Sequence, residues 1–288
     1  MKFLVHKKNN EVKVALNDNE KAINLDELIN DLQINDINYV IENIDSIEHK
    51  VKSLYRNKEL SGYDTADLNY LPAVDPATII CVGLNYRKHA EETNVTIPES
   101  PILFNKFKNT ITANNCDVTL PKKAKQVDYE VELGIVIGKD CKEVPVEEAL
   151  EYVAGYTAVN DFSARDLQMK TPQWMLGKIS DGFCPVGPNL VTKTTIPNPN
   201  NLALKTTLNG EVRQNSNTSD MIFTCAEIVS YISDYMTLSP GDLIITGTPE
   251  GVILGDPEDK RVWLKDGDEL VVEIEKIGQL KNKMANEI

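Results

Sequence analysis

The chain is organised around one stretch near its middle, Asp128-Tyr129-Glu130-Val131-Glu132-Leu133-Gly134-Ile135-Val136-Ile137-Gly138. From Val131 onward the stretch predicts a buried strand, because apolar residues fall on both faces and Gly138 ends the run. Its first half alternates acidic residues with others. Side chains of a strand repeat their direction every second residue, so the carboxylates of Asp128, Glu130 and Glu132 should share one face.

This acidic face has two interpretations. Like charges repel, and acids beside an apolar core are costly unless something neutralises them. A divalent cation would do so, and oxygen ligands suit Mg²⁺, Mn²⁺ or Ca²⁺. Alternatively, the face lies in water at the edge of a sheet. The spacing of the acids leaves both interpretations open.

The composition describes a globular, acidic protein. The 288 residues are 41% hydrophobic and 26% charged, with a formal net charge of −14. An acidic surface argues against nucleic acid and anionic membranes as partners. No apolar run is long enough to cross a bilayer, and no signal-peptide pattern follows Met1. Five scattered cysteines without a C-x-x-C pair suggest reduced thiols and a cytoplasmic protein.

Two domains are expected. Residues 1–70 predict a small α/β domain, with strands at 12–16 and 22–25 and one long helix at 37–55 that has an apolar face. Residues 71–288 predict a mainly β domain with α+β elements. Its expected strands are 78–82, 131–138, 155–161, 202–208, 242–246 and 270–274, the last of which closes the chain. Short helices are expected at 85–92, 147–153 and 162–168.

Three further features of the mainly β domain carry polar side chains that suit chemistry. On a helix, His89 and Glu92 would face the same way, so the carboxylate could orient the imidazole as a general base requires; the alternative is a solvated surface pair. Asp161 could cap the following helix or provide a third carboxylate to a metal. Lys178 could stabilise an oxyanion, or lie on the surface as most lysines do.

Five motifs occur in an order that resembles the fumarylacetoacetate hydrolase family, over roughly residues 76–282. They are Gly83-x-Asn85-Tyr86-x-x-His89-x-x-Glu92, Asp128-Tyr129-Glu130-Val131-Glu132-Leu133, Asn160-Asp161-x-Ser163-x-Arg165-Asp166-x-Gln168, Gly177-Lys178-x-x-Asp181-Gly182-Phe183-x-Pro185 and Gly247-Thr248-Pro249-x-Gly251-Val252. The small N-terminal domain is similar to that of the family's bacterial branch.

The resemblance implies a mixed β-sandwich roll and a homodimer. It implies Mg²⁺ or Mn²⁺, with Ca²⁺ as a substitute in crystals, held by Glu130, Glu132 and Asp161. It also implies a lid that carries His89 and Glu92. The family roles of the remaining site residues are charge stabilisation or substrate binding, and they fall on Lys178, Arg165, Gln168 and Thr248.

The reaction that the resemblance implies first is hydrolysis of a C–C bond in an acylpyruvate or fumarylpyruvate, a small 2-oxo acid, through a metal-stabilised enolate, with His89 activating water. The alternatives are isomerisation of 2-hydroxyhepta-2,4-diene-1,7-dioate, decarboxylation of an oxaloacetate-type acid, and a catalytically idle binding protein. The chain departs from the family pattern at Ile179, at residues 107–110 and at Lys276, so substrate identity is the property most affected.

Overall fold

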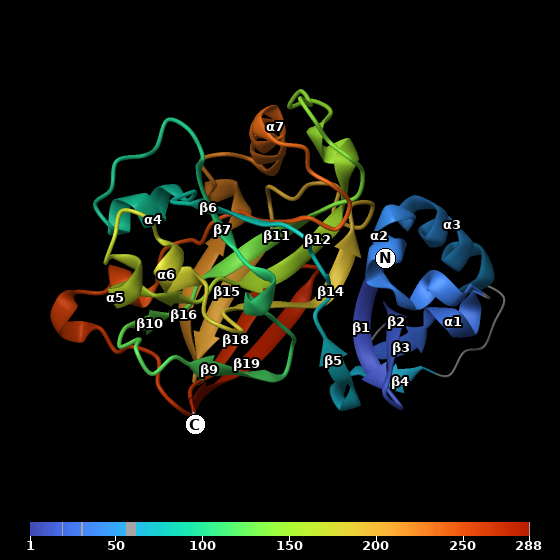
Figure 1. Ribbon diagram of the computed structural model, residues 1–288, viewed down its shortest axis with the longest axis horizontal. Helices are drawn as coiled ribbons and strands as arrows, with labels where there is room; N and C mark the ends of the chain where they lie inside the picture. Colours follow the sequence, from blue (N-terminus) through green and yellow to red (C-terminus); the bar gives the residue numbers. More distant parts are fainter. Residues whose placement is uncertain (19, 30, 56–61, 288) are drawn as a thin grey trace.

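A long mixed sheet runs through the molecule in the computed structural model, which describes residues 1–18, 20–29, 31–55 and 62–287 (Figure 1). Its strands are hydrogen-bonded in the order β4-β3-β2-β1-β14-β12-β11-β17-β6-β7, with β5 paired to β1 and β8 to β14. In chain order they are β1 (Lys2–Lys8), β2 (Glu11–Asp18), β3 (Lys21–Asn24), β4 (Tyr63–Asp64), β5 (Asn69–Leu71), β6 (Ile79–Gly83), β7 (Ile102–Lys106), β8 (Ile111–Thr112), β11 (Val131–Ile137), β12 (Val153–Asn160), β14 (Cys184–Thr192) and β17 (Leu243–Ile245).

The acidic stretch enters the middle of this sheet as β11. All seven residues of β11 are buried, as their apolar character on both faces predicts. β12 flanks β11 on one side and β17 on the other, both antiparallel to it. Because its place in the sheet is fixed from both sides, β11 holds the acidic residues at its start in a rigid position.

A second sheet packs against the first and completes the roll. Its order is β16-β15-β18-β19-β9, and a short β10–β13 pair lies beside it. These strands are β9 (Cys116–Leu120), β10 (Val127–Asp128), β13 (Ser163–Ala164), β15 (Ala203–Leu208), β16 (Glu211–Asn217), β18 (Glu269–Ile274) and β19 (Gly278–Asn286). One apolar core joins Leu133 and Ile135 of β11 to Leu204, Val272 and Leu280 of the second sheet. The mainly β fold with α+β elements is therefore confirmed.

The expectation that residues 270–274 close the chain is wrong. β19 follows and pairs with β18 and, in parallel, with β9. Leu280, Asn282 and Met284 point inward between exposed neighbours, the alternation of a half-buried strand. Lys276, in the turn before β19, has φ of +66°, in the left-handed region that favours glycine. Lys276, at which the chain departs from the family pattern, is therefore a turn residue remote from the site.

The N-terminal residues form strands that join the main sheet and helices that pack on these strands. The start of β1 pairs with β14, with Phe3 opposite Leu190. The long helix expected at 37–55 is two helices, α2 (Ile37–Glu42) and α3 (Ile44–Tyr55), because Asn43 between them leaves helical geometry, with φ of −111° and ψ of 21°. Their apolar faces pack on the N-terminal strands and share a core with Val136 and Leu243 of the main sheet. A domain boundary at residue 70 stays a prediction.

The helices are short and lie at the margins of the sheets. They are α1 (Leu25–Leu28), α2 (Ile37–Glu42), α3 (Ile44–Tyr55), α4 (Arg87–Glu92), α5 (Arg165–Gln168), α6 (Met175–Lys178) and α7 (Cys225–Tyr235). Single 3₁₀ turns are η1 (Leu32–Asn35), η2 (Thr65–Asp67), η3 (Lys108–Thr110), η4 (Ala149–Tyr152), η5 (Thr218–Asp220), η6 (Ile253–Gly255) and η7 (Glu258–Lys260). Across the described part of the chain, no helix has the length and apolar character to span a membrane.

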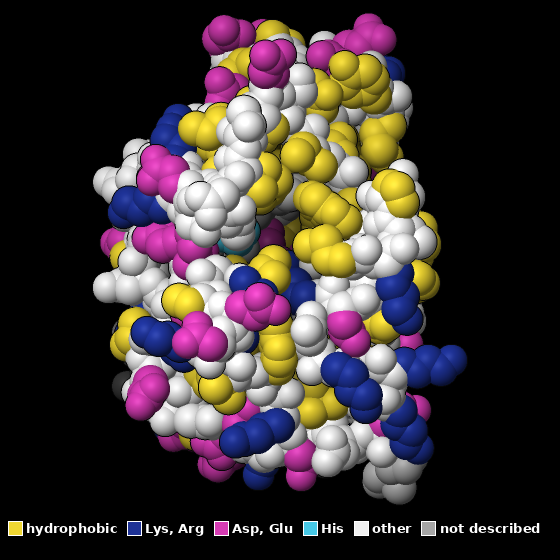
Figure 2. Space-filling view, turned by 90° about the vertical axis from the view of Figure 1, so that its left-hand side faces the viewer, with side chains coloured by type: hydrophobic (Ala, Val, Ile, Leu, Met, Phe, Trp, Pro, Cys, Tyr) yellow, Lys and Arg dark blue, Asp and Glu magenta, His cyan; other side chains and the backbone are white. Residues whose placement is uncertain are grey.

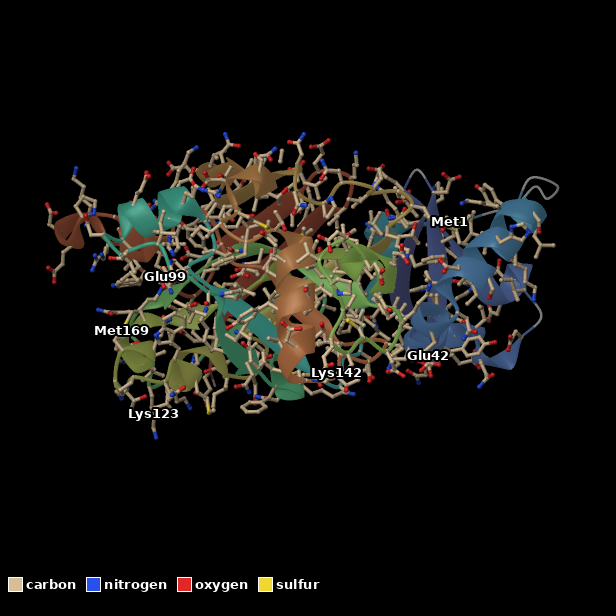
Figure 3. All side chains as sticks on the ribbon, turned by 90° about the horizontal axis from the view of Figure 1, so that it is seen from above. Met1, Glu42, Glu99, Lys123, Lys142 and Met169 are labelled. Atoms are coloured by element: carbon tan, nitrogen blue, oxygen red, sulfur yellow. The ribbon has the colours of Figure 1, made fainter. Side chains whose placement is uncertain are left out.

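The two ends of the long axis differ in content. Figure 3 shows Met1 and Glu42 toward one end, with the N-terminal strands and helices, and Glu99 and Met169 toward the other. Helices α4, α5 and α6 gather at this second end (Figure 1). They surround the mouth of the site described next.

Candidate metal and active site

Three buried carboxylates meet where β11 begins and β12 ends. Pairing of these strands sets Val131 opposite Asn160, which brings Glu130, Glu132 and Asp161 together. Each of the three offers a carboxylate oxygen, and these oxygens lie within 4.8 Å of one another. The interpretation of Asp161 as a helix cap is wrong, because α5 begins only at Arg165, after Ala164. Its oxygens contact two lysines instead.

Buried cations compensate these carboxylates. Lys178 Nζ lies 2.7 Å from both Glu130 Oε2 and Asp161 Oδ2. Arg165 Nη2 lies 2.7 Å from Glu130 Oε1, and Lys106 Nζ lies 2.5 Å from Asp161 Oδ1. Burial opposes the charges of Lys178 and Arg165, but the neighbouring carboxylates outweigh that cost and raise the pKa of each cation. Lys178 is thus a buried residue of the site and not a surface lysine.

The two glutamates have opposite electrostatic environments. Burial opposes ionisation of Glu130, yet the charges of Lys178 and Arg165 prevail and lower its pKa to about 2. For Glu132, burial and the negative charges of Asp161 and Glu130 raise the pKa well above its usual range. Gly247 N donates to Glu132 Oε2 at 2.5 Å, which offsets only part of this effect. The site therefore has an excess of negative charge centred on Glu132.

This excess suits a divalent cation. The donors are carboxylate oxygens, which hard ions such as Mg²⁺ and Mn²⁺ prefer. They converge from three directions, are buried, and include one acid that the protein's own cations leave poorly compensated. Glu130, Glu132 and Asp161 are therefore chemically fitted to hold such an ion.

Asp128 shares the acidic face but serves a different purpose. Its Oδ2 accepts a hydrogen bond from Arg165 Nε at 3.0 Å, and its Oδ1 accepts from the backbone of Ile253 at 2.9 Å. Asp128 and Glu130 therefore contact the same guanidinium group. The prediction that these acids lie on one side is correct, and none of that side is a solvated sheet edge.

His89, which is buried, and Glu92, which is partly buried, form a pair over the same region. Both belong to α4, with His89 Nδ1 lying 3.3 Å from Glu92 Oε2. His89 is only 6% exposed, which excludes the solvated surface pair. Gly251 N donates to Glu92 Oε1 at 2.9 Å, so the loop that follows Gly247 holds both Glu92 and Glu132.

A cavity of about 130 Å³ is lined by His89 of this pair and by two of the carboxylates, Glu130 and Glu132. Figure 2 shows it as a hollow with a histidine side chain inside and hydrophobic side chains gathered along its rim. Trp174 and Phe104 form one wall as an edge-to-face pair, with ring centroids 5.5 Å apart. A Cβ on Gly83 would lie 2.4 Å from the Trp174 ring, so glycine is required there. The cavity residues are Val82, Gly83, Leu84, His89, Thr93, Val95, Phe104, Glu130, Glu132, Arg165, Gln168, Met169, Trp174, Lys178, Thr248 and Leu254.

The residues expected to bind substrate, Arg165, Gln168 and Thr248, all line this cavity. Their side chains are held in place by different hydrogen bonds. Gln168 Oε1 accepts a hydrogen bond from Arg165 Nη1 at 3.1 Å. The hydroxyl of Thr248 donates to Val131 O at 3.0 Å and accepts from Gln214 Nε2 at 2.9 Å. Thr248 therefore anchors its own loop to β11. Its role toward a substrate stays a prediction.

Two of the departures from the family pattern touch each other. Asn109 Nδ2 donates to Ile179 O at 2.9 Å and to Asp181 Oδ1 at 2.6 Å. These bonds tie η3 to the end of α6, next to Lys178. The two departures are therefore one local change in how the backbone after Lys178 is held.

Sequence reasoning missed several residues that support the site. Lys106 is completely buried against Asp161, although a lysine at a strand end is usually exposed. Gln214, also buried, accepts from Val131 N at 3.1 Å and donates to Pro249 O at 3.0 Å. Only the apolar neighbours of Lys106, in β7, could have signalled its burial. The contacts of Gln214 are non-local and have no sequence signal.

The low pKa of Glu130 predicts a pH dependence of stability. Its pKa falls from an ordinary 4.5 to about 2 on folding, so it stabilises the fold above pH 4.5 and loses that contribution as the pH falls toward 2. Urea unfolding across this range should show a flatter pH dependence for Glu130→Gln than for the parent. The exposed-site change Glu258→Gln is the control, and equal slopes for all three proteins would refute the assignment.

Comparison with known proteins adds the following. Residues 78–285 match the family model described as fumarylacetoacetate (FAA) hydrolase C-terminal. Over 214 residues, 74% of this chain and 68% of the relative, the sequence is 46% identical to the oxaloacetate tautomerase Fahd2a, mitochondrial, of Rattus norvegicus.

Two solved structures are also similar. The 2-hydroxyhepta-2,4-diene-1,7-dioate isomerase of Mycobacterium marinum is 34% identical with a TM-score of 0.77, covering 100% of this chain and 99% of that one. The maleylpyruvate hydrolase of Sphingobium sp. SYK-6, solved with manganese(II) and pyruvate, is 24% identical with a TM-score of 0.83, covering all of both chains. The second similarity concerns the fold alone.

Proposed function

Because the chain belongs to the fumarylacetoacetate hydrolase family, we propose that it is a metal-dependent enzyme that interconverts the enol and keto forms of oxaloacetate. One observation carries the proposal: two carboxylates of the buried acidic cluster, Glu130 and Glu132, line the same small cavity as the buried His89. A volume of about 130 Å³ suits a substrate of a few carbon atoms. The name of the Rattus norvegicus relative supports oxaloacetate as that substrate.

Glu130, Glu132 and Asp161 would hold the ion, Mg²⁺ or Mn²⁺. When bound, it would attract the carboxylate and the 2-oxo oxygen of the substrate and stabilise the enolate form. The protein residues do the remaining work. Lys178 and Arg165, fixed by their ion pairs, supply positive charge at the cavity wall where the substrate's negative charge lies. The Phe104–Trp174 wall, with the Phe104 ring centroid 4.9 Å from Lys178 Nζ, excludes water beside this cation.

Tautomerisation moves a proton between oxygen and carbon, and His89 is placed to carry it. Its Nδ1 faces Glu92, so Nε2 is the ring nitrogen left for the substrate. Glu92 is itself held by Gly251 N and therefore keeps the imidazole ring in one orientation. Proton transfer by a positioned side chain is worth about 100-fold or more in rate.

Hydrolysis of an acylpyruvate is the second candidate. The buried His89–Glu92 pair favours it, because a histidine supported by a carboxylate is the usual means of activating water. The two reactions share the enolate and differ in whether water attacks a second carbonyl carbon. A homodimer, the other expectation from the family, stays a prediction.

The proposed function is tested with purified protein, Mg²⁺ or Mn²⁺ and a panel of substrates. Enol oxaloacetate, prepared as the solid, is dissolved in a dry aprotic solvent and diluted into aqueous buffer, and its absorbance decay is followed with and without enzyme. Acylpyruvates are followed by release of pyruvate. Faster enol loss without pyruvate release supports the tautomerase. Pyruvate release from acylpyruvates supports the hydrolase, and inactivity in every assay with bound metal overturns both.

Removal of one metal ligand should weaken the metal site without unfolding the protein. Glu132→Ala removes a charged ligand, so the affinity for Mn²⁺ measured by calorimetry should fall by about 10-fold or more. Enol–keto conversion at limiting metal should fall with it. Glu211→Ala, an exposed carboxylate on β16, is the matched control. A parental Mn²⁺ titration for Glu132→Ala would remove Glu132 from the site.

A further inference from the structure

Lys106 is a fully buried cation that the proposed reaction does not use. It is the last residue of β7, and none of its side chain is exposed. Its ammonium lies 2.5 Å from Asp161 Oδ1 and 3.3 Å from Phe162 O. A buried lysine is costly, so its interaction with Asp161 must be specific to repay its desolvation.

The two oxygens of Asp161 have different partners. Lys178, which lines the cavity, contacts Oδ2 at 2.7 Å. Lys106 contacts Oδ1. The carboxylate plane is thereby fixed, with Oδ2 on the side of Lys178, the cation that lines the cavity.

The same arrangement recurs at the other two acids. Arg165 Nη2 donates a hydrogen bond to Glu130 Oε1, and Gly247 N donates one to Glu132 Oε2. Each carboxylate therefore has one oxygen occupied by a buried donor other than Lys178. The remaining oxygens, one from each acid, are Glu132 Oε1 and, in contact with the Lys178 ammonium, Glu130 Oε2 and Asp161 Oδ2; an ion would share these last two with Lys178.

Ligation by single oxygens discriminates between ions of equal charge. Mg²⁺ takes six ligands in near-ideal octahedral geometry and is usually bound through few carboxylate oxygens plus water and substrate. Ca²⁺ takes six to eight oxygens and often uses both oxygens of one carboxylate. A site in which each acid is limited to one oxygen favours the smaller ion.

We propose that Lys106 is a positioning residue that restricts Asp161 to one-oxygen ligation and so makes the site selective for Mg²⁺ and Mn²⁺ over Ca²⁺. The inference rests on the proposed metal site. The inference adds a cause for the choice of ion. That cause is the action of Lys106 on Asp161, although Lys106 itself would contact neither metal nor substrate.

The test is the ratio of the Ca²⁺ and Mg²⁺ dissociation constants, measured by calorimetry for the parent and Lys106→Met. Loss of the ammonium charge affects both ions alike because both are divalent, so their ratio isolates the geometry. Without the ammonium of Lys106, Asp161 Oδ1 has no donor, so Asp161 should bind Ca²⁺ through both oxygens. The preference for Mg²⁺ over Ca²⁺ should therefore fall about 10-fold. An unchanged ratio would overturn the inference.

Two further variants complete the experiment. Lys108→Met removes an exposed lysine that pairs with Asp75 and should keep the parental ratio. Lys106→Gln retains an amide donor in place of the ammonium and should keep most of the preference. If Lys106→Met does not fold, Lys106→Ala, which also lacks a donor, takes its place and should show the same fall in the ratio. A Lys106→Gln ratio that shifts as far as that of Lys106→Met counts against positioning. Absence of divalent binding by the parent overturns the proposed metal site itself, a distinguishable result.

Discussion

Arg165→Met is expected to lower the free energy of unfolding by about 3–5 kcal/mol, the usual cost of removing one partner from a buried ion pair. Arg165 is 4% exposed and bridges two buried acids, with Nε 3.0 Å from Asp128 Oδ2 and Nη2 2.7 Å from Glu130 Oε1. Methionine replaces the aliphatic part of the side chain but leaves both carboxylates without this cation. Urea unfolding of the two proteins at neutral pH measures the difference.

Arg213 is a matched control that separates the effect of burying an ion pair from the effect of removing a positive charge. Arg213 makes one ion pair with Asp256, in which both side chains are about one-third exposed. Arg213→Met should therefore cost about 1 kcal/mol or less. Adding Asp128→Asn to Arg165→Met should recover part of the lost stability, because it removes one of the uncompensated charges. Equal losses for Arg165→Met and Arg213→Met would contradict the assignment of Arg165 as the central buried cation.

His89→Gln is expected to slow enol–keto conversion, and any acylpyruvate hydrolysis, by about 100-fold or more, the scale for loss of a positioned acid–base group. Mn²⁺ affinity should stay at the parental value because no ligand of the ion changes. Metal-assisted decarboxylation of oxaloacetate needs no proton from His89 as the C–C bond breaks. It should suffer less from His89→Gln than from Glu132→Ala.

Two further variants serve as comparisons for His89→Gln. Glu92→Gln should give a milder defect, because it weakens only the support at His89 Nδ1. His49→Gln, at an exposed position on α3, should leave all rates unchanged. Parental turnover by His89→Gln would show that the buried pair is structural and that another group moves the proton.

Local patterns predicted the parts of the fold that depend on neighbouring residues. The unbroken apolar run after Glu132 predicted β11, and the spacing of Ile37, Val40 and Ile41 predicted the helical face that packs on the N-terminal strands. The spacing of the acids placed Asp128, Glu130 and Glu132 on one side. Their proximity to Asp161 was one of two open alternatives from the residues, and only the family resemblance favoured it, because it depends on the pairing of β11 with β12.

The contacts that sequence reasoning missed are between distant segments. Nothing near Lys106 indicates that Asp161, fifty-five positions later, will receive its ammonium. The hydrogen bond from Gly247 to Glu132 is made by the backbone, which carries no residue-specific signal. The strand β19 was missed for a different reason: its outward positions are polar, and of its inward positions Leu280, Asn282 and Met284 only two are apolar, so the alternation is weak in the sequence.

The pairing of β1 with β14 has a consequence for how the protein is made. Phe3 lies opposite Leu190, so its partner leaves the ribosome only after 187 further residues have been added. At 5–20 residues per second, this takes roughly 10–40 seconds. For that interval the start of β1 presents an open hydrogen-bonding edge and apolar side chains that the finished sheet covers. The nascent chain therefore carries, from its first residues, the kind of surface that chaperones bind and that neighbouring nascent chains can pair with.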